Sequence, residues 1–289
     1  MPDPRPDSDG AEPGDGRVVV VTGGTRGIGK GIAEAFLGAG DQVVVCGRHQ
    51  PDPGELPAAV GSSSPGGEGR VPWAGRRVAN FVLADVRRHD DAEALVSAVV
   101  ETWGRLDVLV NNAGGSPAAD AASMSPRLFE SVVTLNLLAP FFCAQAANRV
   151  MQRQSSGGVI VNVGSVSGMR PSPGTAAYGA AKAGLVNLTE TLAVEWAPKV
   201  RVNCVSAGMV ATSAAFDHYG GEEGLAAVAE TVPLLRLGVP ADVAAACLFL
   251  ASPGAAYVSG ANLLVHGAGE RPAFLGARKG TGGPGAPTG

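Results

Sequence analysis

The sequence has few cysteines and no strong charge bias, and both features exclude classes of protein. It has four cysteines in 289 residues, each within an apolar run and none close to another. This spacing is unlike a disulfide framework or a metal site, so we expect buried thiols in a reducing compartment and no bound metal. The formal net charge is only −4, with no block of like charge and no basic stripe. Nucleic acid and anionic membranes are therefore not expected as partners.

The sequence also lacks a long hydrophobic run and a secretion signal. No apolar run approaches the length of a membrane span, and residues 1–16 have no apolar segment of the kind found in signal peptides. We therefore expect a soluble, cytoplasmic protein. Segments rich in Pro, Gly and Ser predict a disordered tail at 1–16, an elaborated loop at 51–75 with a short helix near 55–60, and a flexible tail at 271–289.

Between the two tails, short apolar runs alternate with longer helical patterns. Apolar runs without polar alternation, separated by helices, indicate a parallel sheet covered on both faces. We therefore predict one doubly wound α/β domain over 17–270, the Rossmann fold, with a helical substrate lid at 209–236. The predicted strands cover 18–21, 42–46, 78–84, 106–110, 159–163, 201–205 and 262–265, and the predicted helices cover 28–37, 90–102, 126–154 (with a kink near Pro140), 176–196 and 240–251.

A glycine-rich turn, Thr22–Gly29, follows the first predicted strand and opens the first predicted helix. Glycines allow positive φ angles and let the backbone approach a phosphate, and the helix N-terminus offers unpaired N–H groups. The spacing is G-x-x-x-G-x-G rather than the G-x-G-x-x-G dinucleotide fingerprint. We predict cofactor contacts from Gly23, Thr25, Arg26, Gly27, Ile28 and Gly29.

The second predicted strand ends in Cys46-Gly47-Arg48, where an acidic residue often binds the ribose 2′-hydroxyl of NAD. A guanidinium instead pairs with phosphate in a forked geometry. Arg48, with Arg26 as a second contact, therefore predicts NADP(H) over NAD(H). The alternative is that Arg48 is only a solvated loop residue.

Two further turns complete the predicted cofactor site. Asn111-Asn112-Ala113-Gly114 follows the fourth strand, and Asp85-Val86 follows the third. Ligands of doubly wound sheets bind in the crevice at the carboxyl ends of the strands, so these turns should meet the glycine-rich turn there. We predict cofactor contacts from Asp85, Val86, Asn112, Ala113 and Gly114, with the Asp85 carboxylate accepting from the adenine amino group.

A tyrosine and a lysine lie four residues apart on one predicted helix. Tyr178 and Lys182 therefore share a helix face, where an ammonium would lower the pKa of a phenol and make it a usable general acid or base. Ser165 lies 13 residues before the tyrosine, at a strand end, and can donate to a substrate oxygen that gains negative charge. Asn136, on the long helix, is placed to hold a water that links Lys182 to solvent.

The order of these motifs along the chain resembles the short-chain dehydrogenase/reductase family, in its short, single-domain, NADP-preferring branch of 3-oxoacyl-reductase type. The resemblance covers about 17–268. It implies hydride transfer to or from the nicotinamide C4 by a catalytic tetrad. In that tetrad Ser165 polarises the carbonyl, Tyr178 donates the proton, Lys182 holds the nicotinamide ribose and lowers the tyrosine pKa, and Asn136 supports the proton relay. Tyr178 and Lys182 thus count as cofactor contacts as well.

The resemblance also implies homo-oligomers, tetramers or dimers, built through helices that match 126–154 and 176–197. The chain departs from the family pattern in three places. The usual Pro-Gly after the sixth strand is Ala207-Gly208, the usual Val-Asp-Gly near the C-terminus is Val265-His266-Gly267, and the 51–75 loop is unusually long. We still expect cofactor contacts from Gly208, Val210 and Thr212, and a structural or interfacial role for His266.

Small and apolar residues dominate the segments expected to line the substrate pocket, which are Ser116-Pro117, 166–175 and 209–236. They favour a bulky, weakly polar ketone or alcohol, such as a β-ketoacyl thioester, a polyketide or a steroid-like ring. Arg170 is either a ligand for a carboxylate or an exposed side chain. A non-catalytic NADP-binding regulator remains the alternative function, since fold does not fix function. A nucleotide-sugar epimerase would need a larger C-terminal domain than this chain has.

Overall fold

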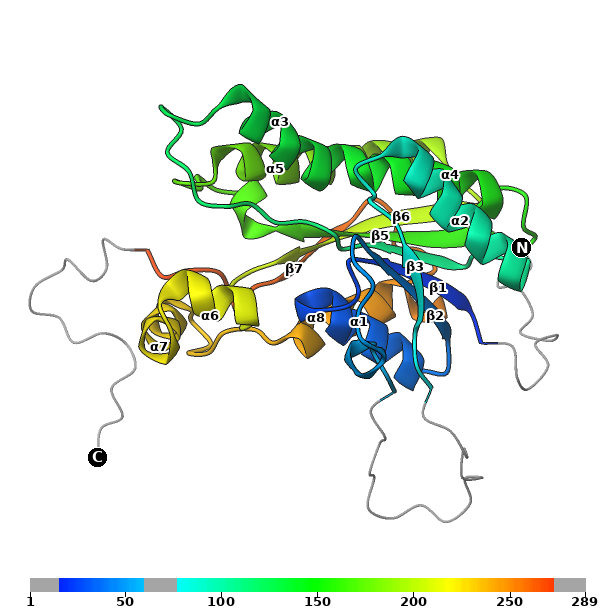
Figure 1. Cartoon of the computed structure of the whole chain (residues 1–289), viewed down its shortest axis with the longest axis horizontal. Helices are drawn as coiled ribbons and strands as arrows, with labels where there is room; N and C mark the ends of the chain where they lie inside the picture. Colours follow the sequence, from blue (N-terminus) through cyan, green and yellow to red (C-terminus); the bar gives the residue numbers. More distant parts are fainter. Residues whose placement is uncertain (1–15, 60–76, 273–289) are drawn as a thin grey trace, which may run out of the picture.

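Seven parallel strands form one sheet in the order β3-β2-β1-β4-β5-β6-β7 (Figure 1). The computed structural model describes residues 16–59 and 77–272. The sheet and its strand order confirm the predicted doubly wound α/β class. The strands are β1 (Val18–Thr22), β2 (Gln42–Gly47), β3 (Asn80–Leu83), β4 (Val108–Asn111), β5 (Gly158–Ser165), β6 (Val200–Ala207) and β7 (Asn262–Val265).

Helices cover both faces of this sheet. One face carries α1 and α8, and the other carries α2, α4 and α5, while α6 and α7 lie beyond the carboxyl ends of the strands (Figure 1). The segment 209–236, predicted as a substrate lid, contains these last two helices. The helices are α1 (Gly27–Gly38), α2 (His89–Trp103), α3 (Pro126–Val133), α4 (Ala139–Met151), α5 (Ala176–Glu195), α6 (Ser213–Tyr219), α7 (Glu222–Thr231) and α8 (Pro240–Leu250), with short 3-10 turns at Pro53–Glu55, Val166–Gly168 and Pro253–Ala255.

The central strands are buried on both sides, which explains their continuous apolar character. In β1, Val18 and Val20 belong to the core under α2 and α4, whereas Val19 and Val21 belong to the core under α1 and α8. Successive side chains of a strand point to opposite faces, so each face receives every second valine. All four cysteines are buried, as predicted.

The predicted long helix at 126–154 differs from the observed one in its interior. A π-turn at Thr134–Leu138 separates α3 from α4, and α4 ends at Met151. The irregular turn thus lies near Pro140, where the sequence predicts a kink, and it ends just before the proline, where the Ala139 amide donates to the Thr134 carbonyl. A proline has no N–H for the carbonyl four residues earlier, which favours a local break of the α pattern.

The same stretch, Pro126–Met151, is long and apolar enough to cross a membrane by length and composition alone, with 33% of its most apolar window buried. This differs from the expectation that no apolar run approaches that length. Core helices of globular proteins pass the same test, and α4 packs against α2, β4 and β5.

The loop after β2 also differs from the prediction. The short helix expected near 55–60 is a 3-10 turn at Pro53–Glu55, which begins after a capping box formed by Asp52 and Glu55. Ala58 then bridges to Val78 before β3. The rest of the 51–75 loop lies outside the described residues, as do 1–15 of the N-terminal tail and 273–289 of the C-terminal tail.

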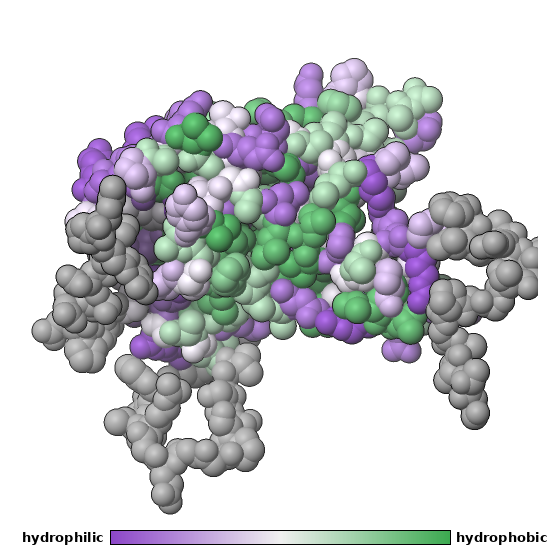
Figure 2. Space-filling model, turned by 180° about the vertical axis from the view of Figure 1, so that it is seen from behind, coloured by the Kyte–Doolittle hydropathy of each residue, from purple (hydrophilic) through white to green (hydrophobic). Residues whose placement is uncertain are grey.

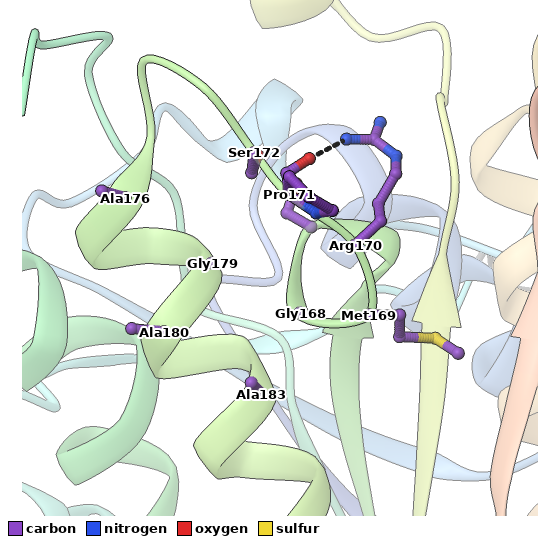
Figure 3. A pocket seen from close by; sticks show the side chains of 10 residues that line it. Gly168, Met169, Arg170, Pro171, Ser172, Ala176, Gly179, Ala180 and Ala183 are labelled. Atoms are coloured by element: carbon purple, nitrogen blue, oxygen red, sulfur yellow. Dashed lines mark hydrogen bonds between the residues drawn. The ribbon is translucent and has the colours of Figure 1, made fainter.

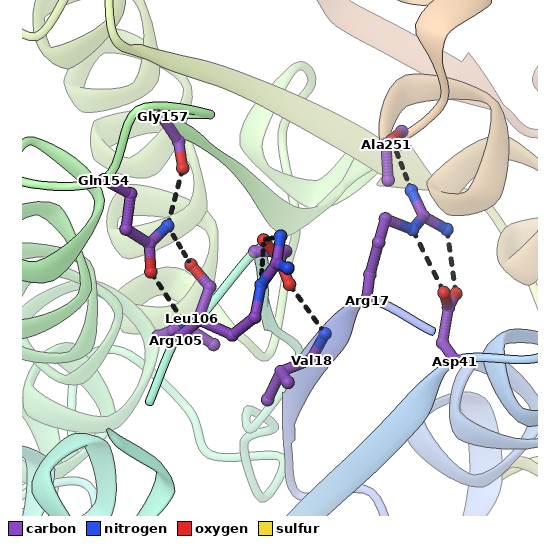
Figure 4. Close-up of polar contacts among 9 residues, drawn as sticks. Arg17, Val18, Asp41, Arg105, Leu106, Gln154, Gly157 and Ala251 are labelled. Carbon is purple, nitrogen blue, oxygen red and sulfur yellow. Dashed lines mark hydrogen bonds and ion pairs between the residues drawn. The ribbon is translucent and has the colours of Figure 1, made fainter. Parts of the chain in front are cut away.

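Polar contacts stabilise the amino ends of the strands, which lie opposite the expected site (Figure 4). The Arg17 guanidinium donates to both carboxylate oxygens of Asp41, at 3.1 and 2.8 Å, and to the Ala251 carbonyl at 2.6 Å. The Gln154 side chain accepts from the Leu106 amide at 2.8 Å and donates to the Leu106 carbonyl at 3.0 Å. These contacts tie the amino ends of the strands to the ends of α8 and α4, and leave the carboxyl ends free for a ligand.

Candidate functional site

The glycine-rich turn between β1 and α1 has the backbone geometry that the sequence predicts. Gly23 and Gly27 have φ angles of +64° and +54°, in the left-handed region that glycine tolerates best. A Cβ atom at Gly29 would lie 2.4 Å from Asn112 Nδ2, so no side chain fits there. A Cβ at Gly27 would meet nothing closer than Thr212 at 3.7 Å, so the backbone is open on that side.

The N-terminus of α1 is free to bind an anion. Its N-cap, Arg26, makes no side-chain capping bond, so the first-turn N–H groups stay available, and the positive end of the helix dipole points the same way. An open glycine backbone at the start of a 12-residue helix fits the pyrophosphate of a dinucleotide. Thr25 and Ile28 are half-buried and Arg26 is exposed.

Side-chain hydrogen bonds join this turn to the turn after β4. The Thr22 hydroxyl accepts from the backbone amides of Asn112 and Ala113, each at 3.0 Å. The Asn112 amide group donates in return to the carbonyls of Thr22 and Gly23, at 2.9 and 3.2 Å. The two turns therefore converge as predicted, but both N–H groups of the Asn112 side chain are used within the protein, and only its Oδ1 is left for a ligand.

Two arginines, Arg48 and Arg87, lie just after the ends of β2 and β3. Arg48 is exposed and forms no hydrogen bond or ion pair with the described part of the chain. The Asp85 carboxylate is held by Arg87, whose Nε lies 2.9 Å from Oδ1. This hydrogen bond, and to a smaller extent the nearby charge of Arg48, lowers the pKa of Asp85. Val86 beside it is buried.

Arg87 is a residue that the sequence reasoning missed. Its guanidinium hydrogen-bonds to the Asp85 carboxylate, which was expected to accept from the adenine amino group. The signal was present, since an arginine two residues after an aspartate at a strand end is well placed to fold back on it.

The side chains expected to be catalytic come together at the ends of β5 and the start of α5. Ser165 is the last residue of β5, while Tyr178 and Lys182 lie on the first two turns of α5. Lys182 is buried and donates to the Val163 carbonyl at 2.7 Å. Its Nζ lies 5.7 Å from the centroid of the Tyr178 ring. The Ser165 hydroxyl accepts from the Ser167 amide at 3.2 Å, and it is near enough to Tyr178 to influence the pKa of that phenol.

The electrostatics of this pair correct one prediction. Burial raises the pKa of Tyr178, and the hydrogen bond from Ser165 opposes that rise. Burial also lowers the pKa of Lys182 to about 8. The expected lowering of the tyrosine pKa by the ammonium is therefore wrong for the ligand-free chain. The reason is that the ammonium is directed at a backbone carbonyl and the ring, and desolvation penalises both charged forms.

Asn136 lies in the π-turn and is fully buried. Its Oδ1 accepts from the Gly115 amide at 2.9 Å, and its Nδ2 donates to the carbonyls of Gly115 and Val132 at 2.8 and 2.9 Å. A Cβ at Gly114 would lie 2.8 Å from Asn136 Oδ1 and 3.4 Å from Lys182 Nζ. The structure thus brings Asn136 Oδ1 and Lys182 Nζ to the same side of Gly114, where a Cβ would lie. The hydrogen bonds of Asn136 anchor the loop after β4.

The segment after β6 reaches back toward the glycine-rich turn. The Gly208 amide donates to the Val265 carbonyl at 2.9 Å, and a Cβ at Gly208 would lie 2.7 Å from His266 Cβ, so only glycine fits against this histidine. Val210 is buried and pairs with Gly238. The Thr212 hydroxyl caps α6 by accepting from Ala215 N at 3.2 Å.

A cavity of about 470 Å³ lies beside the site, between the loop after β5 and the outer face of α5 (Figure 3). It includes part of the segment expected to line the substrate pocket, but neither Tyr178 nor the lid. Arg170 donates to the Pro171 carbonyl at 2.9 Å and pairs with Glu270 of the C-terminal segment. The lining residues are Ser167, Gly168, Met169, Arg170, Pro171, Ser172, Ala176, Gly179, Ala180 and Ala183.

Known proteins resemble this chain over nearly all of its described length. Residues 23–268 match the family described as enoyl-(acyl carrier protein) reductase. The chain is 36% identical over 253 residues to an uncharacterized oxidoreductase of Mycobacterium tuberculosis, covering 88% of this chain and 92% of the relative. It is also 36% identical over 253 residues to a 3-oxoacyl-[acyl-carrier-protein] reductase of Synechocystis, covering 87% and 96%. The ligand-free aldohexose dehydrogenase of Thermoplasma acidophilum superposes with a TM-score of 0.76 at 28% identity, covering 94% of this chain and 98% of the other.

Proposed function

Since the chain belongs to the short-chain dehydrogenase/reductase family of oxidoreductases, we propose that it uses NADP(H) to interconvert a ketone and a secondary alcohol. The observation that carries the proposal is the meeting of Ser165, Tyr178 and Lys182 beside the glycine-rich turn. Each of these side chains has a plausible structural role alone, but together they place a hydroxyl, a phenol and an ammonium at the carboxyl edge of the sheet.

The preference for NADP(H) rests on Arg48 and Arg26. Arg48 is exposed at the point where an NAD-binding strand carries an acid, and Arg26 is exposed at the N-terminus of α1. A guanidinium that has no ion-pair partner among the described residues can pair with a 2′-phosphate at little cost, because no ion pair within that part of the chain has to break. Arg87 neutralises Asp85 nearby, which removes a carboxylate charge that would repel the phosphate.

The chain's own side chains would supply the acid chemistry of the reaction. When bound, the nicotinamide supplies or accepts a hydride at its C4 position. Ser165 would donate a hydrogen bond to the substrate oxygen as negative charge develops there. Tyr178 would donate its proton to that oxygen, and its raised pKa keeps it in the neutral, proton-donating form at neutral pH. The neutral phenol is the form of Tyr178 that the reduction of a ketone requires.

A bulky, weakly polar substrate is supported by the surface around the site. Large apolar side chains are exposed on the loop after β5 and on the lid segment, among them Met169, Phe216, Leu234 and Leu235, with exposed fractions from 44% to 63%. Such side chains would be covered by an apolar substrate. We propose a β-ketoacyl thioester, a polyketide or a steroid-like ketone.

We also propose that the enzyme is a cytoplasmic homo-oligomer, a dimer or tetramer, whose contacts use the α3–α4 stretch and α5. Phe129, Leu138 and Val194 of these helices are exposed, Val194 by 80%. Large apolar side chains are exposed on α8 and β7 as well, at Phe249 and Leu264, and Figure 2 shows apolar surface at the centre of the face seen from behind. A second copy of the chain would cover these faces.

The test follows the absorbance of reduced nicotinamide with purified protein, NADPH or NADH, and a panel of β-ketoacyl thioesters and polycyclic ketones. We expect turnover with NADPH that is lost in Tyr178→Phe and kept in Tyr257→Phe, a matched control at a fully exposed tyrosine. A preference for NADH would refute the cofactor assignment and leave the catalytic residues in place. Tight NADPH binding without turnover of any ketone would favour the non-catalytic regulator.

A further inference from the structure

Buried polar side chains form a ladder of hydrogen bonds beneath the catalytic residues. Asn111 of β4 and Asn162 of β5 are paired neighbours in the sheet, and the Asn111 amide donates to Asn162 Oδ1 at 2.9 Å. Asn162 Nδ2 donates in turn to the Thr189 hydroxyl of α5 at 2.9 Å. The ladder ends where Thr189 donates to the Leu185 carbonyl at 2.7 Å. All three polar side chains are at most 2% exposed.

This ladder lies in a layer that is otherwise apolar. Ile160 and Leu192 are fully or nearly fully buried in the same core. Amides and hydroxyls are costly to bury unless they are hydrogen-bonded. Such groups can replace apolar packing where they specify one alignment of the elements that they connect.

The connected elements are those that carry the catalytic residues. Asn162 lies three residues before Ser165 on β5, and Thr189 lies seven residues, about two helical turns, after Lys182 on the same face of α5. Asn111 also donates to the Pro140 carbonyl at 3.1 Å, at the end of the π-turn that holds Asn136.

We propose that the Asn162–Thr189 hydrogen bond positions α5 along β5 and thereby sets Tyr178 and Lys182 at the height of Ser165. Apolar contacts alone leave the sliding of a helix along a strand poorly determined, because they are not directional. A single buried amide–hydroxyl pair has one favourable alignment. Asn162 and Thr189 are thus positioning residues that act through the catalytic side chains and do not touch a substrate. Only the expected change in kcat rests on the proposed function; the positioning of α5 by Asn162 and Thr189 does not.

The test compares Thr189→Val with Thr191→Val. Thr191 makes the same kind of bond one turn back along α5, to the Asn187 carbonyl at 3.1 Å, but it is exposed and does not reach the sheet. We expect Thr189→Val to lower kcat about 10- to 100-fold, with KM for NADPH within about threefold of the wild type. Thr191→Val should match the wild type, and Thr189→Ser, which keeps the hydroxyl, should restore most of the activity.

A second readout needs no substrate. The ionisation of Tyr178 is followed by phenolate absorbance, as the difference between each protein and its Tyr178→Phe counterpart. Because Ser165, across the β5–α5 boundary, lowers the pKa of Tyr178, a shift of α5 away from β5 in Thr189→Val should raise the tyrosine pKa. If the single variant does not fold, the Asn162→Leu/Thr189→Val pair removes both partners of this bond. Asn111 then loses the Asn162 oxygen as an acceptor but keeps its bond to the Pro140 carbonyl.

The two readouts separate the failure of each claim. A folded Thr189→Val protein with wild-type kcat and wild-type Tyr178 titration would overturn the positioning role. A wild-type protein that reduces no ketone would overturn the proposed function, while the titration would still decide whether the ladder sets the tyrosine environment.

Discussion

Lys182 offers a sharp physical test of the site, because its burial should make the folded chain less stable at neutral pH. The side chain is 3% exposed, and burial lowers its pKa from 10.5 to about 8. One pKa unit corresponds to about 1.4 kcal/mol between the two protonation states, so a charged Lys182 should cost the folded state about 3 kcal/mol. Replacement by methionine, which is similar in size, removes that cost.

The pH dependence follows from where the proton is bound. Below pH 8 the lysine is charged in both states and the full cost is present. Between about pH 8 and pH 10.5 the folded chain releases the proton while the unfolded chain keeps it, so the free energy of unfolding rises with pH. Above pH 10.5 the group is neutral in both states and the cost is gone.

Lys182→Met should therefore be more stable than the wild type at pH 7 by about 2 kcal/mol, after about 1 kcal/mol is subtracted for the lost bond to the Val163 carbonyl. By pH 10.5 this advantage should have declined by about 3 kcal/mol. Urea unfolding at a series of pH values measures the difference. Titrating groups that do not interact with Lys182 cancel between the two proteins, whereas the pKa of Cys204 is lowered by the lysine charge and changes with it. Lys199→Met, at an exposed lysine that donates to the Gln154 carbonyl, is the control. A difference for Lys182→Met that stays constant with pH would refute the reasoning.

Three further predictions concern the cofactor turn and the substrate side. Arg48→Ala should weaken NADPH binding about 10- to 100-fold and leave NADH binding unchanged in fluorescence titrations, since only NADPH carries the 2′-phosphate; equal losses would refute the assignment. Gly29→Ala should lower the free energy of unfolding, measured by denaturant titration, by about 1–3 kcal/mol. The reason is that its Cβ would lie 2.4 Å from the Asn112 amide nitrogen. Gly38→Ala, where the added Cβ meets open space, should not destabilise the chain. Glu270→Gln should free Arg170 and raise kcat/KM for carboxylated ketones but not for uncharged ones; a rise for both would contradict the charge argument.

The fold and most of the site could be predicted because their signals are local in the sequence. The valine run of β1, the glycines after it and the Tyr178–Lys182 spacing each fall within a few residues. Hydrophobic period and turn chemistry are sufficient to place such features on strands, turns and helices. Their convergence at one edge then follows from the topology of a parallel sheet.

The features that could not be predicted depend on contacts between distant segments. The π-turn is not marked by its own residues, and the bonds of Asn136 to Gly115 span 21 positions. The sign of the Tyr178 pKa shift depends on burial, which no spacing reveals. Asn162 and Thr189, 27 positions apart, interrupt apolar patterns on β5 and α5. Each taken alone is an isolated polar residue, and only the packing of the helix on the strand pairs them.

The most direct test of the central claim traces the hydride itself. Purified protein is incubated with NADPH deuterated at the transferred C4 position and a β-ketoacyl thioester or polycyclic ketone, and the alcohol is analysed by mass spectrometry. We predict one deuterium at the carbinol carbon with the wild type, and no alcohol above background with Tyr178→Phe, because proton donation by Tyr178 must accompany the transfer. Alcohol without the label, or equal labelling by Tyr178→Phe, would contradict the account.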